Sequence, residues 1–264
     1  MTDINLGIFT AYLSPERSIY VTSERASIRY HNYENIRLQD FIRGLIKGKI
    51  EKRHLNDIPN PEHPLPFVAQ RDKKITVKRL FQCLNHFLKD NTIIIADVGD
   101  ALIGSIDLSI HRHTEYLAPA YYTSMGFAIP ASIGAQLANP ELRALVIVGD
   151  GAFQMTGMEL STLARYKLNP IVIVLNNRGY GTERPIQDGS YNDLLPWQYS
   201  LIPKVLGAGR GFSIKTEEEF EQALKAAEIY AKGFSILDVH LDPYDISPAL
   251  RRFTKRLSKK VKER

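Results

Sequence analysis

Residues 144–183 constrain the fold of this chain more than any other stretch. They contain two unbroken apolar runs, 144–148 and 170–175, which are typical of parallel strands covered on both faces. Thr156 and Glu159 have the spacing of a helix capping box, which predicts a helix between the runs. The apolar face predicted for that helix holds Met158, Leu160, Leu163, Ala164 and Leu168. Strand, helix and strand in this order predict a right-handed crossover in an α/β domain.

Polar side chains stand where each of these strands ends. Asp150 lies within Gly149-Asp150-Gly151 after the first strand, and Asn176-Asn177 ends the second. Because the carboxyl ends of neighbouring parallel strands meet at one edge of the sheet, we expect these side chains to lie together where open α/β sheets bind ligands. Carboxylate, amide and backbone carbonyl oxygens are the hard ligands that Mg²⁺ or Ca²⁺ prefers.

The same residues carry a family resemblance. Gly-Asp-Gly, the 24 residues 152–175 and then Asn-Asn resemble the diphosphate-binding signature of thiamine-diphosphate enzymes. The segment 176–183, Asn-Asn-Arg-Gly-Tyr-Gly-Thr-Glu, is similar to that of the 2-keto-acid decarboxylases, the pyruvate and indolepyruvate decarboxylase group. Tyr191-Asn192-Asp193 and Trp197 continue the likeness. It implies thiamine diphosphate and Mg²⁺ as cofactors, and non-oxidative decarboxylation of a 2-keto acid to an aldehyde as the activity.

The resemblance also implies roles for individual residues. Asp150, Asn177 and the Gly179 carbonyl match the ligands of the Mg²⁺ that anchors the diphosphate. Glu183 matches the active-site glutamate that takes part in proton transfers near the reacting carbon. The other implied cofactor-binding residues are Val98, Gly99, Asp100, Thr123, Ser124, Met125, Gly149, Gly151, Ala152, Phe153 and Tyr180.

Two of the segments that hold these residues carry side chains that differ from the family pattern. The turn 97–100, Asp-Val-Gly-Asp, is similar to the family turn that contacts the diphosphate and the pyrimidine, but Asp100 and Ala101 replace its usual hydroxyl residues. Ala152 likewise stands where a serine often follows Gly-Asp-Gly. These replacements affect single hydrogen bonds to phosphate, so cofactor binding is still expected.

Residues 122–127 are predicted to open a helix that runs towards Ala138, with Pro130 near its first turn. This segment resembles the one whose backbone binds the aminopyrimidine ring of the cofactor. By position, Met125 is the bulky apolar side chain that props the cofactor into a bent shape.

Three parts are predicted along the chain. Residues 1–50 resemble the last part of the middle domain of the decarboxylases, with Asn5-Leu6-Gly7, strands at 18–22 and 26–31, and a helix at 37–47. Residues 51–74 contain four prolines and are predicted to be a linker. Residues 75–264 are predicted to form one doubly wound, mostly parallel sheet with helices on both faces and a basic C-terminal helix. Further helices are predicted at 77–88, 201–206 and 216–231, and further strands at 92–96 and 234–241.

Charge and cysteine content exclude other classes of protein. The pI of about 9.1 suggests nucleic-acid binding. Residues 251–264, however, hold eight Lys or Arg and one acid, and their net charge of +7 exceeds the net charge of +5 of the whole chain. The basicity therefore belongs to the tail, and no nucleic-acid partner is expected. A single Cys83 excludes an internal disulfide framework and fits a cytoplasmic protein. The apolar runs are too short to span a membrane, and His111 and His113 lack further ligands at zinc-site spacing.

The pyrimidine-binding domain of the decarboxylases has no counterpart in residues 1–75. The resemblance therefore predicts a half-enzyme that needs a partner chain carrying that domain, in a homo- or hetero-oligomer. Two alternatives stay open: a catalytically silent cofactor-binding or interaction module, and a carboligase of the acetolactate-synthase type, which Asp97-Val98-Gly99 resembles. The sequence does not indicate which 2-keto acid is the substrate.

Overall fold

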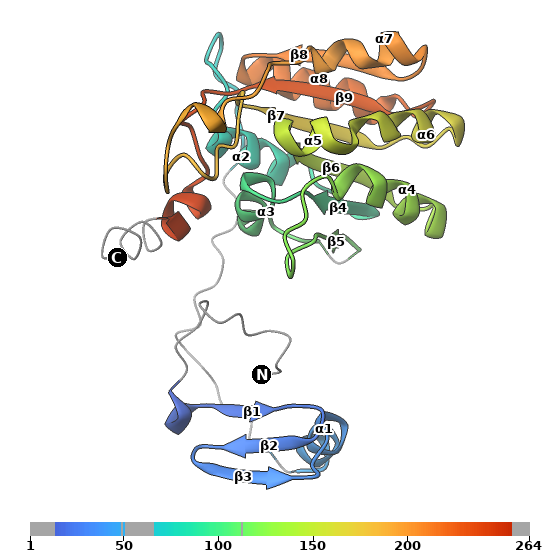
Figure 1. The fold of residues 1–264 in the computed structure, drawn as a ribbon. Coiled ribbons are helices and arrows are strands. Elements are labelled where there is room, and N and C mark those ends of the chain that lie inside the picture. The colour runs from blue at the N-terminus through green and yellow to red at the C-terminus, as the bar shows by residue number, and fades with distance from the viewer. Residues whose placement is uncertain (1–13, 49, 51–65, 112, 255–264) are drawn as a thin grey trace. The chain divides into compact units, whose positions relative to one another are not determined.

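The computed structural model describes residues 14–48, 50, 66–111 and 113–254 (Figure 1). They fall into two compact units, Met1–Pro61 and Glu62–Arg264. The motif Asn5-Leu6-Gly7 and most of the predicted linker lie outside the described residues. Among the described helices, none is long and apolar enough to span a membrane.

The first unit is a small antiparallel sheet with one helix. Its elements are η2 (Pro15–Arg17), β1 (Ile19–Val21), β2 (Arg25–Ile28), β3 (His31–Glu34) and α1 (Leu38–Lys47). The strand near 18–22 and the helix at 37–47 are confirmed. The prediction of one strand over 26–31 is wrong, because the chain turns at Arg29, whose φ of 53° is left-handed, and returns as β3.

The second unit holds the remaining elements. Its strands are β4 (Thr92–Ala96), β5 (Glu115–Leu117), β6 (Arg143–Gly149), β7 (Ile171–Asn176), β8 (Arg210–Ile214) and β9 (Ser235–His240). Its α-helices are α2 (Val77–Phe87), α3 (Asp100–Gly104), α4 (Ala128–Ala138), α5 (Asp150–Thr156), α6 (Leu160–Arg165), α7 (Ile202–Leu206) and α8 (Glu217–Ile229). Its 3-10 turns are η3 (Ser105–Asp107), η4 (Gly157–Glu159), η5 (Ser190–Asn192) and η6 (Tyr199–Leu201).

The six strands form one sheet in the order β5-β4-β6-β7-β9-β8, and every neighbouring pair is parallel. Successive side chains of the apolar strands face opposite sides. Leu145 and Ile147 enter the core with α2 and α8, whereas Val146 and Val148 enter the core with α4, α5 and α6. Helices thus cover both faces of the sheet (Figure 1), which confirms the predicted doubly wound α/β fold.

The strand order reverses its direction at β4, next to β6. The chain passes from β4 to β5 on one side and then crosses to β6 on the other side of β4. At such a reversal the connecting loops leave in opposite directions, and ligands of open α/β sheets bind between them.

The predicted capping box at Thr156 and Glu159 is wrong. Gly149 has an extended conformation and α5 begins at once with Asp150, so Thr156 ends this helix instead of starting one. The Thr156 hydroxyl donates to the Gly126 carbonyl at 2.8 Å. The helix then breaks at η4, which leaves Met158 exposed instead of on the apolar face.

Most other predicted elements of this unit are confirmed within one or two residues. The capping box at Thr216 and Glu219 opens α8, and the Ser247 hydroxyl caps the helical residues 248–254 by accepting from Leu250 N at 2.9 Å. The helix predicted to open at 122 begins only at Ala128. The edge strands β5 and β8 were not predicted.

The described part of the predicted linker, residues 66–74, belongs to the second unit and packs on its helices. Phe67 is buried, and the Arg79 guanidinium lies 4.2 Å from the centre of its ring. Glu217 accepts from Arg79 and from the backbone N–H of Gln70, at 2.6 and 3.0 Å. One buried ion pair thus joins α2, α8 and residues 67–70.

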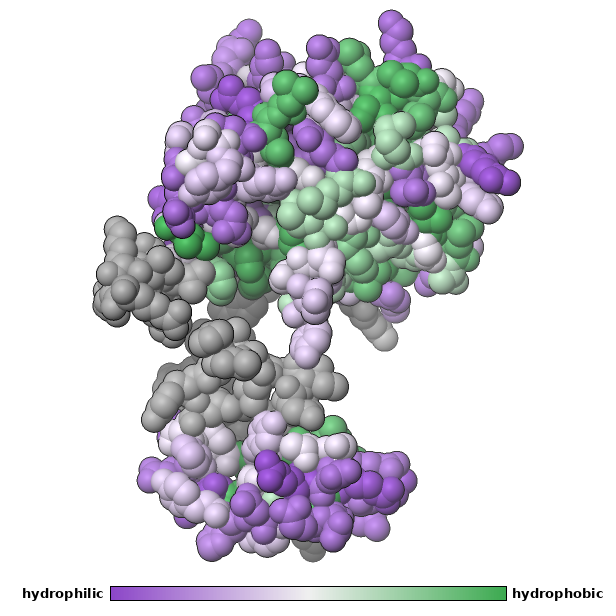
Figure 2. All heavy atoms as spheres, in the orientation of Figure 1, coloured by the Kyte–Doolittle hydropathy of each residue, from purple (hydrophilic) through white to green (hydrophobic). Residues whose placement is uncertain are grey.

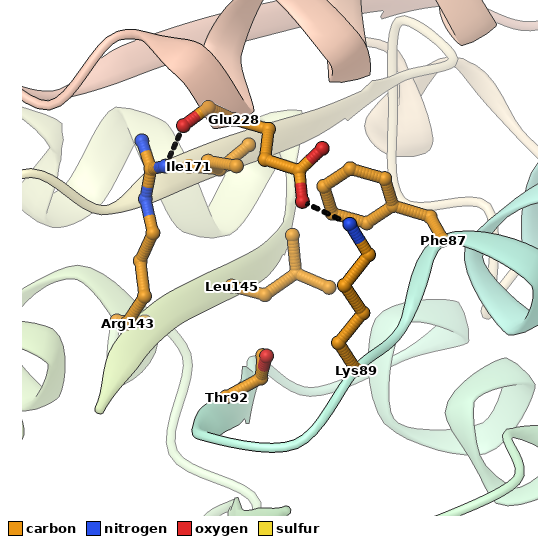
Figure 3. A pocket seen from close by; sticks show the side chains of 8 residues that line it. Phe87, Lys89, Thr92, Arg143, Leu145, Ile171 and Glu228 are labelled. Atoms are coloured by element: carbon orange, nitrogen blue, oxygen red, sulfur yellow. Dashed lines mark hydrogen bonds and ion pairs between the residues drawn. The ribbon is translucent and has the colours of Figure 1, made fainter. Parts of the chain in front are cut away.

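Arg143 caps the C-terminal end of α8 at the amino edge of the sheet (Figure 3). Its guanidinium donates to the carbonyls of Ala227 and Tyr230 at 2.6 and 2.9 Å, and to that of Glu228. The cavity beside it, about 50 Å³, is lined by the first residues of β4, β6 and β7 and so lies at the opposite edge from Asp150. Arg143 therefore has a structural role.

We expect Arg143→Met to lower the free energy of unfolding by about 2–4 kcal/mol, because several helix-end carbonyls lose their donor. Urea denaturation measures this loss. Lys89→Met is the control, since the pair of Lys89 with Glu228 is solvent-exposed and is worth less than about 1 kcal/mol. Equal losses in the two variants would contradict the capping role.

Candidate functional site

Four segments meet at the carboxyl edge of β4, β6 and β7. They are residues 97–100 after β4, 123–127 before α4, 149–153 after β6 and 177–183 after β7. Asp97 bonds the first segment to the second, Thr156 Oγ1 bonds α5 to Gly126, and Asp150 bonds the third to the fourth. Every segment that holds a predicted site residue therefore contributes to one edge.

Asp150 is the buried acid at the centre of this edge. Its Oδ1 accepts from Gly151 N at 2.8 Å and its Oδ2 accepts from Gly179 N at 3.1 Å. Burial raises the pKa of the carboxyl to about 6, although backbone N–H groups around it act in the opposite direction. A bound metal ion would stabilise such a buried carboxylate, because the ion supplies the positive charge that compensates it.

The oxygen atoms around Asp150 fit a hard divalent cation. The Gly179 carbonyl accepts only from Gly181 N in the described structure, at 3.0 Å, so one lone pair stays available. Asn177 is half-buried on the same turn, and its side chain makes no hydrogen bond to any described residue. No cluster of three or more His, Cys, Asp or Glu exists in the described part of the chain, so a metal here would rely on amide and carbonyl oxygens.

Asp97, the first residue of the turn 97–100, bonds two of these segments together, a role that the sequence alone does not show. It is fully buried at the end of β4, where Oδ1 accepts from Val98 N and Gly126 N and Oδ2 accepts from Ala128 N, at 2.8–3.1 Å. Burial raises the pKa of this carboxyl. Asp97 therefore fixes the start of α4 against the first turn. Its place at a strand end, which it shares with Asp150, puts it at this edge, and its bonds to Gly126 and Ala128 come only from the tertiary structure.

Glycines allow the turns to approach one another. A Cβ on Gly99, whose φ is 74°, would lie 2.7 Å from Thr182 Oγ1, and one on Gly151 would lie 2.6 Å from the Tyr180 ring. The loops that follow β4 and β7 are therefore in close contact, as are the turn after β6 and Tyr180.

Some predicted residues direct their side chains away from this edge. The Asp100 Oδ2 atom accepts from Ser247 N at 2.7 Å, and its buried Oδ1 has no partner among the described residues. Phe153 is buried and packs edge-on against Tyr199, with ring centres 5.0 Å apart. Val98 lies in the turn between β4 and α3, and Ala152 is buried in the first turn of α5.

The segment before α4 presents its side chains differently. Thr123, with a φ of 58°, and Ser124 are exposed, whereas Met125 is half-buried against the core that contains α4 and α5. Gly126 follows with a φ of 81°, which only glycine adopts readily.

Glu183 lies in the loop after β7, with its side chain exposed. Its neighbour Arg184 is almost fully buried and pairs with Asp188 and Asp193, at 3.1 and 2.7 Å. Asp193 also forms a β-bridge with Gly179. Arg184 therefore ties the loop of Glu183 to the turn of the proposed metal ligands. Tyr191 is exposed, and Trp197 stacks at a tilt near Tyr199.

We expect Gly179→Ala to lower the free energy of unfolding by about 1–3 kcal/mol, because the added methyl group would overlap the Asn192 carbonyl oxygen. Gly134→Ala in α4 is the control: no atom lies within 4 Å of the added carbon, and the change should be neutral or stabilising by up to about 1 kcal/mol. Thermal or urea unfolding compares the two. A destabilised Gly134→Ala with an unaffected Gly179→Ala would contradict the packing described.

Ser213, His240 and Asp238 form a second constellation, on β8 and β9. The His240 Nε2 atom faces both Ser213 Oγ, at 3.0 Å, and Asp238 Oδ2, at 3.7 Å. A hydrolase triad requires the acid on the other ring nitrogen, so this arrangement is not a nucleophile relay.

Comparison with known proteins identifies the family of this domain. Residues 97–239 match the family model described as "Thiamine pyrophosphate enzyme, C-terminal TPP binding domain". The chain is 29% identical over 252 residues to an alpha-keto-acid decarboxylase of Mycolicibacterium paratuberculosis, covering 93% of this chain and 45% of that protein. It is 30% identical over 258 residues to an indole-3-pyruvate decarboxylase of Azospirillum brasilense, covering 96% and 46%. It is 29% identical over 261 residues to a pyruvate decarboxylase of Aspergillus fumigatus, covering 95% and 46%. The chain thus spans about half the length of these relatives.

Proposed function

Because this chain belongs to the thiamine pyrophosphate enzyme family, we propose that it is the diphosphate-binding half of a 2-keto-acid decarboxylase. The observation that carries the proposal is the bond from Gly179 N to Asp150 Oδ2, which joins the two motif turns around a buried carboxylate. When bound, thiamine pyrophosphate (thiamine diphosphate) supplies an electron sink for the pair left as CO₂ departs, which side chains lack.

The proposed role of Asp150, Asn177 and the Gly179 carbonyl is to hold Mg²⁺ on the diphosphate. The buried charge of Asp150 and the free lone pair of Gly179 support this. Gly149, Gly151, Ala152, Phe153 and Tyr180 would contribute backbone groups or the ring that borders the site. Backbone N–H groups at such a turn suit phosphate oxygens.

The proposed role of the turns 97–100 and 123–127 is to hold the rest of the cofactor. Val98, Gly99 and Asp100 would approach through the backbone, since the Asp100 side chain is bonded to Ser247. Thr123, Ser124 and Met125 would bind the aminopyrimidine and support the bent cofactor. The half-buried position of Met125 against the core supports a fixed prop.

Glu183 is the proposed catalytic residue. Its loop is held by the Arg184 pairs, while its own side chain makes no hydrogen bond or ion pair within the described residues. The carboxyl group is thus available to hold or move a proton at the reacting carbon of a bound 2-keto acid.

A partner chain with a pyrimidine-binding domain is the remaining part of the proposal. Weakly polar and apolar residues gather over α4 and α5 (Figure 2), next to the proposed site. Tyr121 and Tyr122 are both 82% exposed, and Met155 and Met158 are more than half exposed. Such a surface suits a second domain or subunit, in a homo- or hetero-oligomer. The single, buried Cys83 agrees with a cytoplasmic location.

The test is aldehyde release from a panel of 2-keto acids, including pyruvate, indolepyruvate, phenylpyruvate and branched acids, with thiamine diphosphate and Mg²⁺. The chain is assayed alone and after co-expression with a chain that carries a pyrimidine-binding domain. Activity that requires the partner supports the proposal. Cofactor binding without activity in either case would favour a binding module, and a condensed hydroxy-keto acid as product would favour a carboligase.

Glu183→Gln is expected to slow aldehyde release by about 100-fold or more, because the amide of glutamine cannot accept and release a proton as the carboxyl group of Glu183 does. Binding of the cofactor should stay within about threefold of the unmodified chain, since Glu183 is not a proposed metal ligand. Glu141→Gln, an exposed glutamate remote from this loop, is the control. Full activity in Glu183→Gln would overturn the catalytic assignment.

A further inference from the structure

Thr182 supplies the only Ser or Thr hydroxyl in three of the four segments that meet at the carboxyl edge, residues 97–100, 149–153 and 177–183. The turns after β4 and β6 therefore present no such hydroxyl of their own. Phosphate oxygens are strong acceptors, and a hydrogen bond to a charged oxygen is among the stronger ones in proteins. The position of the Thr182 side chain thus bears on how a diphosphate is held.

The Thr182 hydroxyl faces the turn after β4. A Cβ on Gly99 would lie 2.7 Å from the Thr182 Oγ1 atom and 3.9 Å from the Thr182 Cβ atom, whereas the methyl carbon of Thr182 is not within 4 Å. The oxygen is therefore the part of the side chain that approaches Gly99. Because a β-branched side chain has few favourable χ1 rotamers, this orientation is well defined.

The same hydroxyl is free to bind a ligand. Thr182 is half-buried, and its side chain makes no hydrogen bond to any described residue. The fully buried polar atoms without a partner in the described chain do not include Thr182 Oγ1, so this atom is accessible. A donor that is accessible, oriented and unpaired bonds to an incoming acceptor without first breaking a bond in the protein.

The loop of Thr182 is also the loop of the proposed metal ligands. Gly181 packs so closely on Asn177 that a Cβ on it would overlap the Asn177 amide. On the other side of Thr182, the Glu183 N–H donates to the Tyr180 carbonyl at 3.0 Å. These contacts fix the loop, so the hydroxyl is held at the turn after β4 by the same backbone that carries the proposed magnesium ligands.

We propose that the Thr182 hydroxyl donates a hydrogen bond to a diphosphate oxygen of bound thiamine diphosphate. It takes the place of the hydroxyl that Asp100 and Ala101 do not provide. The Asp100 carboxylate cannot do so, because it has the same sign of charge as a phosphate and accepts from Ser247 N. The inference rests on the proposed function and adds to it a residue that the family resemblance does not assign.

Calorimetric titration of the full 264-residue chain with thiamine diphosphate at saturating Mg²⁺ tests this bond. Thr182→Val replaces only the hydroxyl by a methyl group and should weaken binding about tenfold. The melting temperature of the free variant should be unchanged, because the free protein loses no hydrogen bond. Thr182→Ser keeps the hydroxyl and should bind within about threefold of the unmodified chain. Thr162→Val on α6, whose hydroxyl donates to Glu159 at 2.8 Å, is the control and should bind the cofactor normally.

Phosphorus NMR of the bound cofactor locates the bond. At saturating cofactor, a phosphorus resonance of thiamine diphosphate should move in Thr182→Val and stay in place in Thr182→Ser. Three results would overturn this inference alone: unchanged affinity in Thr182→Val, as for a hydroxyl that faces the substrate; weaker binding with unmoved phosphorus resonances; or an equal loss in Thr182→Ser. An unmodified chain that does not bind thiamine diphosphate would overturn the proposed function and this inference with it.

Discussion

Asp150→Asn is expected to weaken magnesium-dependent binding of thiamine diphosphate by about 100-fold or more without unfolding the protein. The amide replaces the only charged member of the proposed ligand set, so the cation loses its main electrostatic partner. The fold should survive, because burial already disfavours the charged form, as the rise of the Asp150 pKa to about 6 indicates. The amide oxygen still serves as an acceptor for Gly151 N or Gly179 N.

Calorimetric titration of the cofactor with and without Mg²⁺ measures this effect. Asp72→Asn, an exposed aspartate of the segment before α2, is the matched control and should bind the cofactor normally. The melting temperature of Asp150→Asn without cofactor should equal or exceed that of the unmodified chain. Magnesium-dependent binding retained within about threefold in Asp150→Asn would exclude Asp150 as the metal ligand.

Glu217→Gln is expected to cost about 3–5 kcal/mol of stability, the largest loss among the variants considered. The Glu217 carboxylate has no exposed surface and accepts from Arg79 Nε and Nη2 at 2.8 and 2.6 Å. Neutralising it leaves the Arg79 guanidinium mostly buried without its charge partner, and it weakens the bond that holds Gln70.

The effect should depend on pH. Burial raises the pKa of Glu217, but the hydrogen bonds from Arg79 and Gln70 N more than offset this, so the folded-state pKa is lowered from 4.5. A lowered folded-state pKa contributes stability that is present above about 4.5 and is lost as the pH falls towards the folded-state pKa. The difference between the unmodified chain and Glu217→Gln should therefore shrink below about pH 4.5.

Urea denaturation at neutral pH and below about pH 4.5 measures the loss of stability in Glu217→Gln and its dependence on pH. The control is Glu221→Gln on the same helix, whose pair with the exposed Lys225 should be worth less than about 1 kcal/mol. A loss in Glu217→Gln that is small, or that does not change with pH, would show that the pair does not hold α2, α8 and residues 67–70 together.

The local sequence is sufficient to predict the four inner strands of the sheet, β4, β6, β7 and β9. A run such as 144–148 is apolar at every position because both faces of a parallel strand are buried, and β6 divides its side chains between the two cores. Asp150 and Asn177 were predicted to lie together because parallel strands with helical crossovers place their carboxyl ends at one edge. The edge strands β5 and β8 were missed because short strands bonded on one side need no such apolar pattern.

The tertiary structure decided what depends on contacts between distant segments. Thr156 has the right spacing for a cap, yet its hydroxyl bonds to Gly126, 30 residues away, and the local signal is overridden. Asp97 reaches Gly126 and Ala128, 29 and 31 residues away, and Arg184 reaches Asp193 across a loop. The sequence by itself determined the four inner strands and the motif turns, because periodicity and spacing are local properties, and its motif residues carried the family resemblance. Only the folded chain showed which polar groups hold those turns together, since a hydrogen bond depends on the position of both its partners.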